Sequence, residues 1–179
     1  MTDRELLDMI QNPEKRNAGI SQFIRQFQKP VYYYIRRMVL SHDDADDLTQ
    51  LVFIKAWKGL DGFRGDSKLS TWLYRIAHNE SVSFLRSSKR LMDVDVADME
   101  HTLGVALQSD VLFSGDEIQV KLQTAIALLP EKQKSVFLMR YYDELKYEEM
   151  SEITGTSVGA LKASYHHAVQ KIETYLAEK

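Results

Sequence analysis

DDLTQLVFIKAWKGLDGFRGDSKLSTWLYRIAHN, residues 46–79, is the stretch that decides the fold. Its first part, Asp46–Trp57, contains no glycine or proline and predicts a helix. At about 100° per residue, one side of that helix is apolar and another side mixes acidic, amide and apolar residues. The first side holds Leu48, Val52 and Ala56, and the second holds Asp46, Asp47, Gln50, Ile54 and Trp57. A helix with apolar residues on two sides is either deeply buried or bound to two partners.

A loop and a second helix complete the stretch. The loop, Asp61–Lys68, has two glycines, both signs of charge and Phe63, which we expect to be exposed. Ser70-Thr71 then starts a helix that carries aromatic, cationic and amide side chains. Stacking rings interleaved with such groups favour single-stranded nucleic acid. The loop has the residue types to hold an unstacked base.

The pattern DLTQ-VF-KAW, followed by FRGDSKLSTWLYRIAHN, resembles region 2 of bacterial sigma-70 factors of the extracytoplasmic-function subgroup. In that family the first helix docks on the clamp of RNA polymerase, in its largest subunit. The loop and second helix hold the opened strand of the −10 promoter element. The resemblance implies polymerase docking by Asp46, Asp47, Gln50 and Phe53. It implies −10 strand binding by Phe63, Arg64, Asp66, Ser67, Lys68, Ser70, Thr71, Trp72, Arg75, His78 and Asn79.

The stretch departs from the family pattern at two positions. Leu51 stands where the family usually has an acid, so one polar docking contact is missing or replaced by an apolar one. Ser83 stands where an aspartate is common, and nothing follows from that. The acidic docking residues also fit a solvated helix face. The rings fit a core as well as a stacking platform, and we expect Trp72 to be partly buried.

Composition bounds the class of protein. A chain of 179 residues, 44% hydrophobic and 27% charged, fits one medium or two small globular domains. Cysteine is absent, which excludes disulfides, thiolate metal sites and cysteine nucleophiles. No apolar run approaches the roughly 20 residues that cross a bilayer, and the N-terminus MTDRELLDMI is too acidic for a signal peptide. We expect a cytoplasmic protein with no membrane insertion of its own.

Charge is unevenly distributed along the chain. Residues 1–90 carry a net charge of +4, residues 91–120 carry seven acids and no Lys or Arg, and residues 121–179 are neutral. A purely acidic segment between balanced blocks is typical of a linker. We therefore predict a domain over 1–90, a flexible acidic linker over 91–117 and a second domain over 118–179. At most a transient helical turn is expected near Val96–Leu107.

Helical signals cover the rest of the chain, and no segment shows strand alternation, so the predicted fold class is all-α. Thr2 and Glu5 have capping-box spacing for a short first helix. Helical periodicity from Ile20 to Val39 continues through Pro30, where we expect a kink or a join. Ser41 can cap the helix that follows.

The last segment, YEEMSEITGTSVGALKASYHHAVQKIETYL, has helix-turn-helix chemistry. Gly155 lies at the turn and Ser157 can cap the second helix. With LPEKQKSVFLMRYY before it, this half resembles sigma region 4, which reads the −35 element in the major groove. The resemblance implies −35 binding by Ser157, Lys162, Ala163, Ser164, His166, His167 and Lys171.

The recognition helix has few cations. Ser164, His167 and Val169 stand where relatives often have arginines, so fewer phosphate contacts and weak binding to free DNA are expected. Adjacent histidines point about 100° apart on a helix, so His166-His167 does not make a metal site. The acids around His42 are more consistent with helix capping than with a metal.

Both halves occur in the order of the sigma family, so the hypothesis is a promoter-specificity subunit that helps to open the −10 region. It implies RNA polymerase core and promoter DNA as partners, an anti-sigma factor from the resemblance alone, no cofactor and no catalysis. A stand-alone helix-turn-helix repressor or response-regulator output module is the alternative, and it leaves residues 46–79 unexplained. A helical adaptor that binds only protein is a third possibility.

Overall fold

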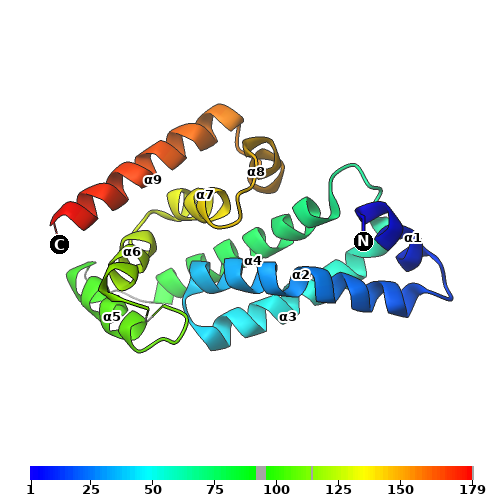
Figure 1. Ribbon diagram of the computed structural model, residues 1–179, viewed down its shortest axis with the longest axis horizontal. Coiled ribbons are helices and arrows are strands. Elements are labelled where there is room, and N and C mark those ends of the chain that lie inside the picture. Colours follow the sequence, from blue (N-terminus) through cyan, green and yellow to red (C-terminus); the bar gives the residue numbers. More distant parts are fainter. Residues whose placement is uncertain (92–95, 114, 179) are drawn as a thin grey trace.

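The computed structural model describes residues 1–91, 96–113 and 115–178. Within these ranges the chain forms nine α-helices and one short 3-10 helix, with no strand (Figure 1). The elements are α1 (Asp3–Gln11), α2 (Arg16–Val39), α3 (His42–Gly59), η1 (Leu60–Gly62), α4 (Leu69–Leu91), α5 (Val96–Gln108), α6 (Glu117–Ala127), α7 (Glu131–Tyr141), α8 (Tyr147–Thr154) and α9 (Val158–Glu178). The all-α prediction is confirmed.

Helices α1–α4 form the N-terminal bundle. α2, α3 and α4 pack against one another, and α3 turns its predicted apolar side, Leu48, Val52 and Ala56, into the core. Leu73 of α4 is fully buried against the same core. The periodicity of residues 46–57 therefore sets which face of α3 points inward and which remains outside.

Short-range side-chain caps begin two helices of this bundle, α1 and α3. Thr2 and Glu5 form the predicted capping box of α1, and the Ser41 hydroxyl accepts a hydrogen bond from the Asp44 amide at 3.3 Å. The start of α4 is capped from a distance, because the Leu69 amide donates to the Asp3 carboxylate at 2.7 Å. Pro30 does not separate two helices, since α2 runs through it to Val39.

Helices α6–α9 form the C-terminal bundle. α8 and α9 make a helix-turn-helix whose turn residue, Gly155, has φ of 72°. That left-handed conformation costs little only for a residue without Cβ, so the glycine ends α8 sharply and redirects the chain into α9. Leu161, Ala168 and Ile172 of α9 are buried, as the spacing predicts.

The segment between the bundles is more helical than predicted. In place of a flexible linker with a transient turn, the structure has α5, which packs against α6. Tyr175 of α9 donates a hydrogen bond to Glu100 at 3.0 Å, and Leu107 is buried. Packing against a neighbour stabilises a helix whose own pattern is weak, which explains the difference. Residues 92–95 and 114 of the predicted linker lie outside the described residues.

The two bundles pack against each other, with α8 against α4 and α7 against α2 (Figure 1). Tyr74 donates a hydrogen bond from its hydroxyl to Asp143 Oδ1 at 3.2 Å. Arg37 places its guanidinium carbon 4.1 Å from the centre of the Tyr142 ring. These contacts join residues about 70 to 105 positions apart in the chain.

The ion pairs described across the same interface all have the same polarity. In each pair described between them, the N-terminal bundle supplies the cation and the later part of the chain supplies the acid. The pairs are Lys68–Glu149 at 2.6 Å, Arg86–Glu131 at 3.0 Å and Arg36–Asp110. The interface is therefore electrostatically polarised.

Arg36 differs from the other two cations because it is buried, with its side chain 4% exposed. Its guanidinium carbon also lies 5.0 Å from the centre of the Phe113 ring. Removing one partner of a buried pair leaves an uncompensated charge and typically costs about 3–5 kcal/mol. Asp110 and Phe113 therefore hold the segment after α5 firmly on α2.

Asp143 is the one strongly perturbed carboxyl described at this interface. Burial raises the pKa of Asp143 to about 6, although the Tyr74 hydrogen bond and the Arg37 charge oppose the rise. The ordinary value is 3.8, so the packed state binds a proton more tightly than the unfolded chain does. Stability attributable to Asp143 therefore increases as pH falls from about 6 toward about 4.

We predict that replacing Asp143 with asparagine removes this pH dependence. The wild-type melting temperature minus that of Asp143→Asn should rise as pH falls from about 7 to about 4.5, because only wild type takes up the proton. Burial lowers the pKa of His78, an opposite effect that both proteins share and that the subtraction removes. Circular-dichroism melts of both proteins across this pH range measure the difference in melting temperature. A difference that stays constant with pH contradicts the prediction.

Candidate functional site

The outer face of α3 carries the predicted docking residues. Asp46, Asp47 and Gln50 are exposed along it, on the side away from the core. Phe53 is half-buried, with its ring centre 5.8 Å from that of Phe23 in an edge-on contact. Three of the four residues therefore present polar groups to solvent, and the fourth joins them to the apolar surface beside them.

That apolar surface is a small cavity of about 140 Å³ between α2 and α3. Two of its side chains are unusually exposed for their size, since Ile54 is 49% and Trp57 is 58% accessible. The full lining is Ile20, Phe23, Ile24, Phe53, Ile54, Trp57 and Leu60. Exposed apolar surface next to acidic groups is typical of a protein-binding site. The sequence indicated this binding surface through the second apolar side of α3, which carries Ile54 and Trp57.

The loop after η1 forms a second hollow, of about 510 Å³. Phe63, expected to be exposed, is half-buried, because its ring packs on Trp72 with centres 5.2 Å apart. Trp72 is half-buried, as expected. The lining residues are Gly59, Gly62, Phe63, Arg64, Asp66, Ser67, Trp72, Arg75 and Glu152. The hollow thus combines two packed rings, two cations and an acid from α8.

Not all of the residues predicted for −10 binding come together at this hollow. Thr71 is buried, and His78 is half-buried with Nδ1 3.0 Å from the Tyr34 hydroxyl. Lys68 and Asn79 are exposed, and Ser70 is half-buried. The structure therefore gathers the loop residues and Arg75, and it directs Thr71 and His78 toward packed surroundings.

The recognition helix α9 exposes most of its predicted −35 residues. Its N-terminus is capped as predicted, because the Ser157 hydroxyl accepts from the Ala160 amide at 3.2 Å. Ser164 is half-buried, unlike the rest. The exposed set is Ser157, Lys162, Ala163, His166, His167 and Lys171. A surface of this kind, with two lysines, is suited to a groove of duplex DNA.

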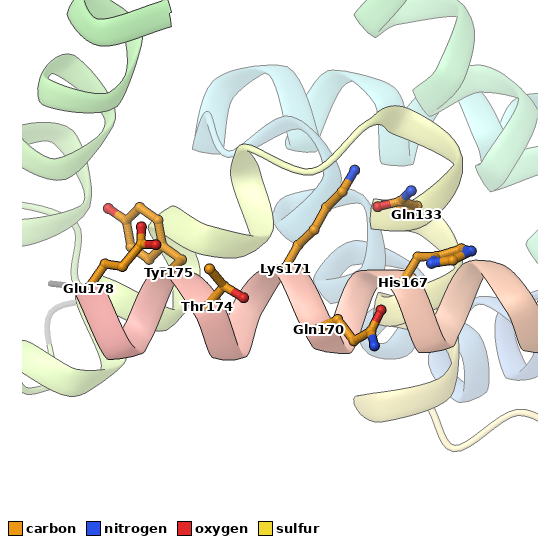
Figure 2. Close-up of a pocket in the computed structure, with 7 residues that line it drawn as sticks. All are labelled: Gln133, His167, Gln170, Lys171, Thr174, Tyr175 and Glu178. Carbon is orange, nitrogen blue, oxygen red and sulfur yellow. The ribbon is translucent and has the colours of Figure 1, made fainter.

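A polar groove continues this surface along α9 (Figure 2). His167 and Lys171 extend from α9 toward Gln133, which comes from the first turns of α7. Gln133 Oε1 is buried without a hydrogen-bond partner. Sequence spacing on α9 could not reveal Gln133, because the contact is between two helices.

Two further properties concern the described part of the chain as a whole. Among these residues, no three His, Asp or Glu side chains come together in a way that could hold a metal ion. In the same residues, no helix combines the length and apolar character needed to span a bilayer.

Two family models match the chain in the order of its bundles. Residues 23–91 match Sigma-70 region 2, and residues 119–172 match Sigma-70 region 4. The first match covers α3, the loop and α4, which a stand-alone helix-turn-helix regulator does not require. That alternative is therefore not favoured.

Similar full-length proteins carry the same family name. The chain is 32% identical over 181 residues to the ECF RNA polymerase sigma-E factor of Escherichia coli K12, covering 97% of this chain and 93% of the relative. It is 30% identical over 182 residues to the RNA polymerase sigma-H factor of Pseudomonas aeruginosa, with the same coverages.

Solved structures share the fold. CnrH, in complex with the cytosolic domain of CnrY, aligns with a TM-score of 0.73 at 20% identity, over 99% of this chain and 98% of CnrH. The sigma factor RpoE of Bartonella quintana, in complex with the anti-sigma factor NepR, aligns with a TM-score of 0.69 at 21% identity, over 88% of this chain and 96% of RpoE. With the sequence matches, these findings lead to one conclusion: the chain belongs to the sigma-70 family of RNA polymerase sigma factors, in its extracytoplasmic-function subgroup.

Proposed function

We propose that this sigma factor docks on the clamp of RNA polymerase through the outer face of α3. The observation that carries the proposal is the exposed set of Asp46, Asp47 and Gln50 beside the accessible rings and methyls of the apolar cavity. Stable interfaces combine a few large apolar anchors with a polar rim. Trp57 is the anchor on this face, and the acids attract a basic partner surface.

The loop and the start of α4 hold the opened −10 strand. Phe63 and Trp72 offer ring faces for bases, and Arg64 and Arg75 offer charge for phosphates around the same hollow. Base stacking contributes about 1–3 kcal/mol per base, and extruding a base costs a few kcal/mol. Two or three captured bases therefore offset strand opening, and no nucleotide hydrolysis is needed.

The exposed side of α9 reads the −35 element in duplex DNA. Its two lysines, Lys162 and Lys171, give few phosphate contacts, so affinity for free DNA is low and depends on polymerase. Once both bundles are held on one polymerase, binding at one promoter element raises the effective concentration of the other bundle at its own element. The two weak interactions therefore combine into tighter promoter binding.

The remaining partners follow from family likeness. Two proteins of similar fold were solved in complexes, one with an anti-sigma factor and one with the cytosolic domain of CnrY. We infer an anti-sigma partner for this chain as well. Because the chain belongs to a family of RNA polymerase sigma factors, we propose that it acts in the cytoplasm as an initiation factor with no catalytic chemistry of its own.

The function is tested by run-off transcription with core polymerase, on promoters selected from genomic DNA by the reconstituted holoenzyme. Wild type should give promoter-dependent transcripts that core alone does not give. Equal amounts of promoter-dependent transcript with and without the chain would contradict the proposal.

Docking is tested with Asp47→Ala/Gln50→Ala and Trp57→Ala. Each should weaken binding to core polymerase, by about tenfold for the polar pair and about 30-fold for the anchor, given the roughly 2 kcal/mol typical of interface hot spots. Ile118→Ala is the control for Trp57, since Ile118 is 69% exposed on α6, away from this face. Fluorescence anisotropy of the labelled sigma chain, titrated with core polymerase, measures affinity, and equal losses in the control would contradict the assignment.

Strand capture is tested with Phe63→Ala. Losing one stacking partner should reduce transcription from a fully paired promoter about tenfold, from the 1–3 kcal/mol per stacked base. A template with the −10 region already unpaired should recover most of that loss, because the enzyme no longer has to open it. A defect of the same size on both templates would mean that Phe63 acts elsewhere.

A further inference from the structure

We propose that the N-terminal helix α1 holds the −10 strand site in shape, and that Asp3 is the positioning residue through which it acts. The strand site here means the loop Asp61–Lys68 together with the first turn of α4. The inference rests on the proposed function of that loop and α4. Asp3 acts through the Leu69 amide, and not by contact with the strand.

The first turn of α4 cannot be capped by the residue before it. That residue is Lys68, whose side chain carries donors and no acceptor for the free amides at a helix start. The Leu69 amide instead donates to Asp3 Oδ2 at 2.7 Å. A carboxylate in this position satisfies one amide and complements the positive end of the helix dipole. The first turn of α4 has no acid of its own, so Asp3 supplies a charge that the local sequence lacks.

α1 is a firm support for this carboxylate. Leu6 and Ile10 bury their side chains almost completely in the core. Gly19 lets α2 approach α1 closely, since a Cβ at this glycine would lie 3.0 Å from Ile10 Cγ1. The capping box at the start of α1 fixes the turn that contains Asp3. Figure 1 shows α1 at the end of the bundle where the loop enters α4.

A second contact from this end of the bundle reaches the start of the loop. Arg16 Nη1 lies 2.8 Å from Asp61 Oδ1, and the same nitrogen donates to the backbone oxygen of Ile10 at 3.3 Å. One guanidinium group thus joins the last turn of α1 to the loop. The Asp61 side chain is 71% exposed, so this pair contributes little by itself. Together, Asp3 and Arg16 hold the loop at both of its ends.

The first turn of α4 in turn places the Trp72 ring. The Trp72 amide donates to the Lys68 carbonyl at 3.0 Å, the bond that begins the helical ladder. The ring packs on Phe63, and it lies so close to Gly59 that a Cβ there would be 3.0 Å from it. Fraying of this turn would move the ring away from both neighbours. A base binds more tightly to a stacking surface that is already formed, because the cost of ordering it on binding is avoided.

The test compares Asp3→Ala, Asp3→Asn and Asp8→Ala, each in the full chain. Alanine at position 3 removes the acceptor for the Leu69 amide, whereas asparagine keeps an oxygen that can accept, as it does at helix N-caps. Asp8→Ala is the matched control for charge and helix. Asp8 is exposed on α1, and its side chain has no described contact with the loop or α4.

The first readout is the affinity of each reconstituted holoenzyme for a fluorescein-labelled oligonucleotide that carries the −10 strand of a selected promoter. Asp3→Ala should bind it about three- to tenfold more weakly than wild type, as expected for loss of one helix cap. Asp3→Asn and Asp8→Ala should bind within about twofold of wild type. Equal affinities for Asp3→Ala and wild type overturn the inference, and so does an equal loss in either of the other variants.

The second readout separates positioning of the strand site from general support of the bundle. Affinity for core polymerase should be the same for Asp3→Ala and wild type, because no described contact joins Asp3 to the outer face of α3. A loss of core affinity as large as the loss of oligonucleotide affinity would mean that Asp3 supports the whole bundle. That result would also overturn the inference.

The same binding assay separates the inference from the function that it rests on. Core polymerase alone gives the background signal. Oligonucleotide binding that Phe63→Ala weakens and Asp3→Ala leaves unchanged overturns the inference alone. Absence of binding above background by the wild-type holoenzyme overturns the proposed strand site, and the positioning role with it.

Discussion

Among the ion pairs between the two halves of the chain, the packing depends most on the buried Arg36–Asp110 pair. Cations of α2, α4 and the loop before α4 face acids of α7, α8 and the segment after α5, and each described pair has the same polarity. The pairs are unequal, because Arg36 is buried with Asp110 whereas Lys68 and Arg86 are largely exposed. Buried pairs resist separation and exposed pairs do not. The molecule thus has one anchored end and one releasable end.

This asymmetry fixes where the two halves of the chain are joined. Asp110 and Phe113 precede the C-terminal bundle, so holding them on α2 fixes the point at which that bundle begins. The contacts at α8 lie farther along the chain. The buried apolar residues of both bundles form one hydrophobic cluster, so apolar packing also joins them.

Local sequence determined most of what could be predicted. Periodicity identified the buried side of α3, short-range spacing identified the capping of α1 and α3, and one glycine identified the turn before α9. Each of these depends on residues within one or two helical turns. The sigma resemblance rested on two such local patterns in their proper order, and family matches over both bundles agree with it.

Contacts between segments that are distant in sequence could not be predicted in this way. The cap that Asp3 gives to Leu69 and the packing of α8 on α4 join distant segments. Phe63 is an aromatic residue in a loop, so the sequence predicted that it is exposed. In the structure its ring packs against the ring of Trp72 and is half-buried. α5 forms in an acidic segment because α6 and α9 supply partners. Charge content showed that this segment is acidic and could not predict which helices it packs against.

The folded state of α5 also affects how far apart the two promoter-reading surfaces can be. Its 13 residues span about 20 Å as a helix, at 1.5 Å per residue. Fully extended, the same residues would reach about 43–47 Å. The extended segment would therefore be roughly 25 Å longer than the helix, the difference between those two lengths. Melting α5 would add this reach only after the Arg36–Asp110 pair breaks, because Asp110 follows α5 and is held on α2.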